Sequence, residues 1–182
     1  MKSERKLYKL GTTFVSIIGT KPIEVKDIGL VVDYLRRISS PASLQAIDAN
    51  IVYGIEHLLE VIKITVESKK RSIMIAKNPE TDLLLRLSYT KQISASLKYG
   101  GIKNDVNCCF VIFGEDKNDL VRVTELINKS FEIDDSVLGP NDEKRIMILS
   151  KIGLNHSSTL FNGNDGSIFM RVICEKSCLI TS

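Results

Sequence analysis

A continuous apolar run of strand length most constrains the fold of this chain. Residues 107–113 read Asn-Cys-Cys-Phe-Val-Ile-Phe and contain no charged side chain. A strand with one face in water alternates polar and apolar residues, whereas an unbroken apolar strand is typical of one that is buried on both faces. We therefore predict that this segment is a central strand of a sheet.

Strand-like segments and helical patterns alternate on both sides of this run. Besides 107–113, we expect strands over 14–18 and 44–47, a short extended piece over 131–133, and a closing strand over 177–181. Periodic apolar residues and capping side chains predict helices after Asp27, from Gly54, after Asn78, after Asp116 or Asn118, after Asn141, and over 168–176. The helix after Asn78 starts with Pro79 and closes at Gly100-Gly101, and Ser88-Tyr89-Thr90 could interrupt or re-cap it.

These patterns predict an α/β (α+β) class, with a small mixed central sheet covered by several helices. The 182 residues, of which 43% are hydrophobic, suit a single domain over 1–182. We expect a flexible N-terminus and a mobile polar loop at about 155–166. No apolar stretch reaches the roughly 20 residues of a membrane span, and no signal peptide is evident, so we expect a cytoplasmic protein that does not contact membranes.

The residues that usually hold metals or catalyse reactions form few patterns here. The four cysteines, Cys108, Cys109, Cys174 and Cys178, lack metal or redox spacing, and only two histidines are present. No phosphate-binding glycine motif occurs. We therefore expect no metal, no cofactor and no small-molecule substrate. Asp134 and Asp135 are adjacent acids that could serve an enzyme, although a turn or helix cap is the commoner role of such a pair.

Charge is distributed unevenly along the chain. Residues 1–103 contain 17 Lys and Arg against 10 Asp and Glu, whereas residues 104–182 contain 8 against 12. A basic first part and an acidic second part favour two faces for two partners. The same distribution also suits an ordinary solvated surface.

Three segments, in order, resemble one known family. Residues 45–59 read Gln-Ala-Ile-Asp-Ala-Asn-Ile-Val-Tyr-Gly-Ile-Glu-His-Leu-Leu, which is similar to the family's "DA…V.G.EHL". Residues 83–93 read Leu-Leu-Leu-Arg-Leu-Ser-Tyr-Thr-Lys-Gln-Ile, similar to its "ILLRLSGSRQI", and 131–138 contain its "IDDSVL". The chain thus resembles the kinase-binding, tRNA-recruiting subunit of the archaeal KEOPS complex, the PRPK-binding protein family of eukaryotes. Tyr89 replaces a usual glycine, and Lys91 a usual arginine.

The resemblance implies a regulatory subunit without a catalytic centre. Such a subunit docks on the kinase-like ATPase subunit of KEOPS and recruits tRNA through its CCA end, for synthesis of threonylcarbamoyladenosine. On this basis the kinase-interface candidates are Leu83, Leu84, Leu87 and Ile93. The tRNA-binding candidates are Lys69, Lys70, Arg71, Arg86, Lys91, Gln92 and Lys98.

Each assignment has a structural alternative. A leucine stripe on a helix is more often core than interface, and scattered cations are more often solvated surface. Gln92 could bond a base edge or only the backbone, and His57 could stack on a base or simply pack on a helix face. Two rival functions remain: a stand-alone RNA-binding module, and a small enzyme that uses Asp134 and Asp135.

Overall fold

The computed structural model describes residues 7–154 and 166–180. The predicted flexible N-terminus falls partly on residues 1–6, and the predicted mobile loop mostly on 155–165, which lie outside the described residues. The chain divides into two compact units. Unit 1 comprises Met1–Ala49 and Ile102–Val137, and unit 2 comprises Asn50–Gly101 and Leu138–Ser182.

Unit 1 contains an antiparallel sheet, and the α/β (α+β) class is confirmed. In the described part of the chain the sheet has four strands in the order β1-β2-β4-β3. Their bounds are β1 Leu7–Leu10, β2 Thr13–Thr20, β3 Ser43–Asp48 and β4 Cys108–Gly114. All three pairings are antiparallel, whereas we expected a mixed sheet. The apolar run is β4, an inner strand as predicted, while β1 was not predicted.

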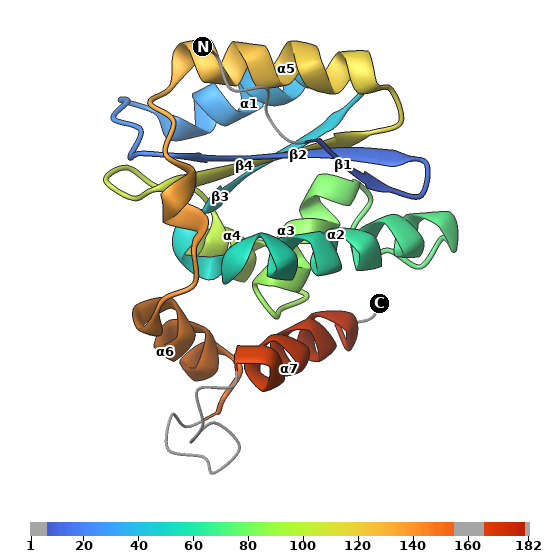
Figure 1. The fold of residues 1–182 in the computed structure, drawn as a ribbon, viewed down its shortest axis with the longest axis vertical. Helices are drawn as coiled ribbons and strands as arrows, with labels where there is room; N and C mark the ends of the chain where they lie inside the picture. Colours follow the sequence, from blue (N-terminus) through green and yellow to red (C-terminus); the bar gives the residue numbers. More distant parts are fainter. Residues whose placement is uncertain (1–6, 155–165, 181–182) are drawn as a thin grey trace. The chain divides into compact units, whose positions relative to one another are not determined.

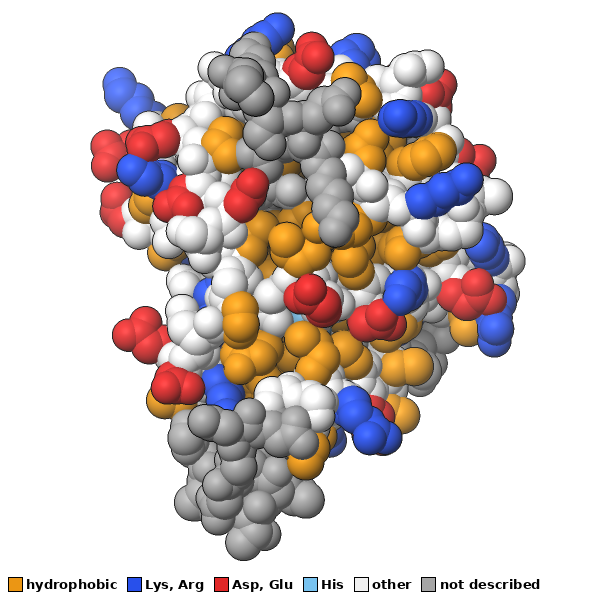
Figure 2. Space-filling view, in the orientation of Figure 1, with side chains coloured by type: hydrophobic (Ala, Val, Ile, Leu, Met, Phe, Trp, Pro, Cys, Tyr) orange, Lys and Arg blue, Asp and Glu red, His pale blue; other side chains and the backbone are white. Residues whose placement is uncertain are grey.

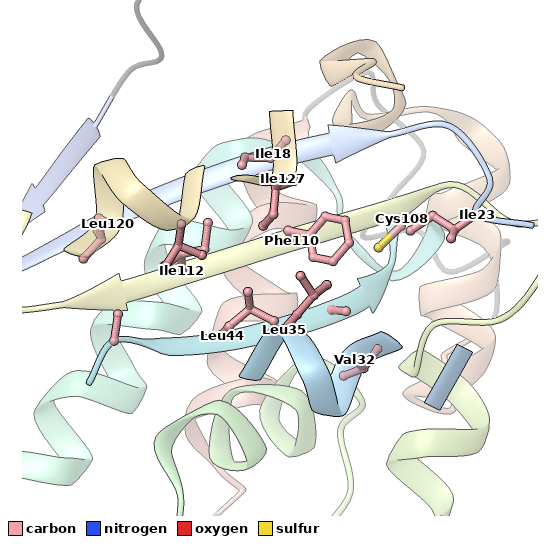
Figure 3. Close-up of a cluster of buried hydrophobic side chains, with 13 residues drawn as sticks. Ile18, Ile23, Val32, Leu35, Leu44, Cys108, Phe110, Ile112, Leu120 and Ile127 are labelled. Atoms are coloured by element: carbon pink, nitrogen blue, oxygen red, sulfur yellow. The ribbon is translucent and has the colours of Figure 1, made fainter. Parts of the chain in front are cut away.

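Two helices cover one face of this sheet and bury the core of unit 1. Helix α1 spans Ile28–Ser39 and α5 spans Lys117–Ser130, and they lie side by side on the sheet (Figure 1). The amide of Leu30 donates to Asp27, which confirms that Asp27 caps α1. Phe110 and Ile112 of β4 point toward Leu35 of α1 and Ile127 of α5 (Figure 3). Full burial of each such side chain stabilises the fold by about 1.5–3 kcal/mol.

Unit 2 consists of helices. The helices described in it are α2 Gly54–Lys70, α3 Pro79–Leu87, α4 Ile93–Gly100, α6 Asp142–Lys151 and α7 Gly166–Cys178. Two short 3-10 turns, Ala49–Ile51 and Asp135–Leu138, lie at the unit boundaries. Helix α2 packs against α3 and α7, and α3 packs against α4. A small apolar cluster joins α6 to α7 through Ile148, Leu149, Phe169 and Ile173.

The break between α3 and α4 lies at the predicted place. Ser88 ends α3, and Tyr89 then adopts a φ of +50°, in the left-handed region that glycine enters most easily. The resemblance implies glycine at this position, and glycine adopts such a φ without steric cost. Gly100 is the last residue of α4, and glycine is required there because an added Cβ would lie 2.4 Å from Ile51 and 2.8 Å from the Ser88 hydroxyl.

The predicted closing strand over 177–181 is wrong. Helix α7 continues through Ser177 and Cys178, and no strand follows among the described residues. Thr181 lies outside them. Within the same ranges, no helix has the length and apolar content to cross a membrane.

Candidate partner-binding surfaces

The leucine stripe of α3 is core. Leu83 and Leu87 are fully buried, and Leu84 is 2% exposed. Because these three side chains are buried, they offer no surface to a kinase. The prediction that they are kinase-interface residues is therefore wrong. Ile93, the fourth candidate, is 53% exposed at the start of α4.

Arg86 is also buried, and its guanidinium joins three helices. Its Nε donates to Asp82 Oδ2 at 2.7 Å, and its Nη2 donates to the Ser68 hydroxyl of α2 at 3.0 Å. Its Nη1 donates to the backbone carbonyls of Ser177 at 3.3 Å and Ile180 at 3.1 Å. Because carbonyls at a helix C-terminus lack partners within the helix, this cation satisfies the end of α7.

The Arg86 contacts leave no room for a phosphate. All three guanidinium nitrogens donate to protein acceptors, and the residue is 2% exposed. The other carboxylate oxygen of Asp82, Oδ1, accepts a hydrogen bond from the Ile75 amide at 2.6 Å. We therefore reassign Arg86 from tRNA contact to a structural role, while Lys69, Lys70, Arg71, Lys91, Gln92 and Lys98 are all exposed.

The first exposed cationic set lies at the end of α2, beside a groove. Lys69 and Lys70 close the helix, and Arg71 donates to Glu67 at 2.8 Å. The groove has a volume of about 570 Å³ and is lined by Lys63, Ile64, Glu67, Ser68, Arg71, Ile73, Arg86 and Cys178. We call it the α2 groove. Sequence reasoning did not predict most of the residues that line this groove. The one local signal in the sequence was the apolar Ile73 just after the basic end of the helix, and this residue is 53% exposed in the structure.

The second exposed set lies on α4. Lys98 belongs to α4, and Lys91 and Gln92 directly precede it. Two apolar residues, Ile93 and Leu97, are 53% and 51% exposed on the same helix. The structure thus brings together candidates that the sequence assigned to two different partners, and it places Lys69–Arg71 elsewhere, at the end of α2.

His57 is buried rather than available for stacking. It is fully buried in α2, and its Nδ1 accepts a hydrogen bond from the Tyr53 amide at 3.2 Å. Its Nε2 has no hydrogen-bond partner in the described part of the protein. Burial lowers the pKa of His57 from 6.5 to about 3, so the ring is neutral at physiological pH. Of the two alternatives for His57, packing within the helix is therefore confirmed, and base stacking is excluded by burial.

The acids Asp134 and Asp135 act as backbone caps. The Gly19 amide donates to Asp135 Oδ1 at 2.8 Å, and the Asp134 amide donates to the Gly19 carbonyl. Hydrogen bonds from the Ser136 hydroxyl and amide lower the pKa of Asp134 below its usual value. A carboxyl with a lowered pKa is ionised at neutral pH and holds no proton to donate as a general acid. Within the described ranges, no three His, Cys, Asp or Glu residues gather as a metal site would require.

The four cysteines all lie in the described part of the chain and form no disulfide there. Cys108 and Cys109 are buried, Cys174 is half-buried and Cys178 is exposed. Cys108 joins the core beneath α1 and α5, and burial raises its pKa well above the usual value. Because a protonated thiol is a poor nucleophile, Cys108 has the inert packing role that the sequence indicated.

The excess positive charge of the chain belongs to unit 2. This unit contains 13 Lys and Arg against nine Asp and Glu, whereas unit 1 contains 12 against 13. On the face shown in Figure 2, blue and red side chains are interspersed rather than gathered into one basic area. Contact with an anionic partner therefore depends on local sets of cations.

The comparisons identify a family. A family model described as "Kinase binding protein CGI-121" matches residues 24–176, which is most of the chain and includes both units. No curated protein matches the sequence.

Arg86→Ala tests the structural role of this arginine. Removing one partner of a buried ion pair leaves Asp82 uncompensated, so we expect the free energy of unfolding to fall by about 3–5 kcal/mol, measured by urea denaturation. The exposed control Lys69→Ala should change it by less than about 0.5 kcal/mol. In Arg86→Lys, hydrogen exchange should accelerate in the last turn of α7. Equal stability of the Arg86→Ala and Lys69→Ala variants would contradict this role.

The buried His57 makes stability depend on pH. Its pKa is about 3 when folded and about 6.5 when unfolded, so the unfolded chain binds the proton more tightly. Stability therefore falls as pH decreases from about 6.5 toward 3. Between pH 7 and pH 5 we expect a loss of about 2 kcal/mol that His57→Gln lacks, measured by denaturant titrations. Identical pH profiles of the two proteins would contradict the assignment.

Proposed function

The chain belongs to the CGI-121 family of kinase-binding proteins, and from this premise we propose that it is a non-catalytic binding subunit of KEOPS. In this role it docks on the kinase-like ATPase subunit and recruits tRNA by its CCA end, for threonylcarbamoyladenosine modification. The observation that carries the proposal is the presence of two separate sets of exposed side chains in unit 2. One lies at the α2 groove, and the other lies on α4.

The α2 groove suits the end of a single RNA strand. Lys69 and Lys70 are exposed cations with no ion pair among the described residues, and Arg71 presents a guanidinium that shares one contact with Glu67. Phosphate contacts by such side chains supply affinity without reading sequence. The groove next to them is lined by Arg71, whose guanidinium plane can stack on an unpaired base, and by Ile64 and Ile73.

The non-catalytic part of the proposal rests on what the acids and thiols already do. Asp134 and Asp135 are engaged by backbone amides, as is Asp82 by the Ile75 amide. The buried Cys108 has a raised pKa and packs in the core. A subunit that positions two partners needs none of these groups for chemistry.

A tRNA titration tests the recruiting role. We expect the purified chain to bind intact tRNA more tightly than tRNA trimmed of its CCA end. The triple variant Lys69→Ala/Lys70→Ala/Arg71→Ala should weaken binding and reduce the salt slope by about two, because each phosphate contact to a single strand contributes about 0.7. Lys91→Ala tests α4 in the same assay.

The matched control is Lys117→Ala/Lys129→Ala, which removes two exposed cations of α5 in unit 1. This control should bind tRNA like the unmodified chain. Equal affinity for intact and trimmed tRNA would contradict recruitment by the CCA end and favour a stand-alone RNA-binding module.

A further inference from the structure

Of the described residues that line the α2 groove, Glu67 is the one acid. Three cations line the groove as well, but two of them are already engaged. Lys63 pairs with Glu60, and the nitrogens of the buried Arg86 donate to protein acceptors. The third cation, Arg71, pairs with Glu67 itself. A ligand in the groove therefore meets a carboxylate and a guanidinium that are held together.

The Glu67 carboxylate keeps one oxygen available for a ligand. The Arg71 Nε donates to Oε1 at 2.8 Å, and within residues 7–154 and 166–180 no donor binds Oε2. Both side chains are accessible, with exposed fractions of 67% for Arg71 and 50% for Glu67. An ionised carboxylate only accepts hydrogen bonds, so Oε2 can bind an N–H or O–H group but repels a phosphate.

This negative charge restricts which part of an RNA strand can lie beside Glu67. In the interior of a strand each ribose is followed by a phosphate, and like charges placed opposite each other weaken binding. The last ribose at a 3′ end differs, because no phosphate follows it and its 2′- and 3′-hydroxyls are free. In dinucleotide-binding folds, an acidic side chain accepts a hydrogen bond from a ribose hydroxyl. An acid in an otherwise cationic groove therefore favours the end of a strand over its interior.

Resting on the proposed function, we infer that Glu67 is a specificity-determining residue, which accepts hydrogen bonds from the hydroxyls of the terminal ribose of tRNA and rejects an end that carries a 3′-phosphate. Lys69 and Lys70 end the same helix and are exposed, so they can contact the phosphates that precede this ribose. The Arg71 guanidinium, held by Glu67, is the plane on which the terminal base stacks. The groove thereby recognises a free RNA 3′ end instead of any single strand.

A base amino group is the other donor in the CCA end that Glu67 could bind. Cytosine and adenine both have such a group, so every base of this sequence offers one. Residues three apart share a helix face, and Glu67 therefore lies beside Lys70. When Lys70 contacts a phosphate, its neighbour Glu67 faces the adjacent ribose rather than the edge of a base. The ribose hydroxyls are thus the donors that we assign to Glu67.

Titrations of the full chain with tRNA that differs only at its terminal ribose test this role. The ends compared are the free hydroxyls, a 2′,3′-dideoxy ribose and a 3′-phosphate, at one fixed salt concentration. We expect the dideoxy end to bind about tenfold more weakly than the free hydroxyls, because a hydrogen bond to a charged group is worth roughly that factor. The 3′-phosphate end should bind more weakly still. In Glu67→Gln the 3′-phosphate end should bind more tightly than it does to the unmodified chain, because the repelling charge is gone.

The matched control is Glu60→Gln, which changes an equally exposed acid of α2 that also pairs with a cation but does not line the groove. This control should leave the preference among the three ends unchanged. If the unmodified chain binds intact and CCA-trimmed tRNA equally, the proposed recruitment and the role of Glu67 both fail. If it prefers intact tRNA but binds all three ends equally, recruitment stands and the role of Glu67 is wrong. Equal weakening of the hydroxyl and dideoxy ends by Glu67→Gln would assign this acid to a base and would also overturn the ribose contact.

Discussion

The buried guanidinium of Arg86 is the interaction on which unit 2 depends. It lies in α3, bonds the side chains of Asp82 and Ser68, and satisfies the carbonyls at the end of α7. A buried cation with so many acceptors is costly to leave unpaired, so the three helices are held in one arrangement. The same contacts explain why α7 continues to Cys178 and place that residue at the edge of the α2 groove.

Most of the fold could be predicted because its signals are local. Side chains that bond the first amides of a helix marked the starts of α1 and α6, and the uniform apolar character of β4 marked an inner strand. The predictions that failed concern segments whose structure depends on residues far away in the sequence. Residues 177–181 contain an apolar run typical of a strand, but the Arg86 guanidinium donates to the carbonyls of Ser177 and Ile180 at the end of α7. Strand β1 has only four residues, and what defines it is its pairing with β2.

The candidate surfaces were harder to predict, since spacing along a helix does not state which face is covered. Leu83 and Ile93 both fit one apolar stripe, yet one is fully buried and the other half exposed, because Tyr89 breaks the helix between them. Arg86 and Lys91 both belong to the segment 83–93, but Arg86 is buried inside unit 2 whereas Lys91 is exposed. The motif thus contains both a structural centre and a surface. A binding subunit needs both, since a rigid interior fixes the geometry of the side chains that it presents.

Under the proposed function, two separate surfaces predict that the two proposed partners bind at the same time. The most direct measurement is the affinity of intact tRNA for the chain alone and for its preformed complex with the kinase-like ATPase subunit, by titration at one fixed salt concentration. Our account predicts that the complex binds tRNA at least as tightly as the free chain, because the α2 groove remains open when the exposed side chains of α4 are covered. Displacement of tRNA by the kinase would contradict it and would show that both partners use one surface.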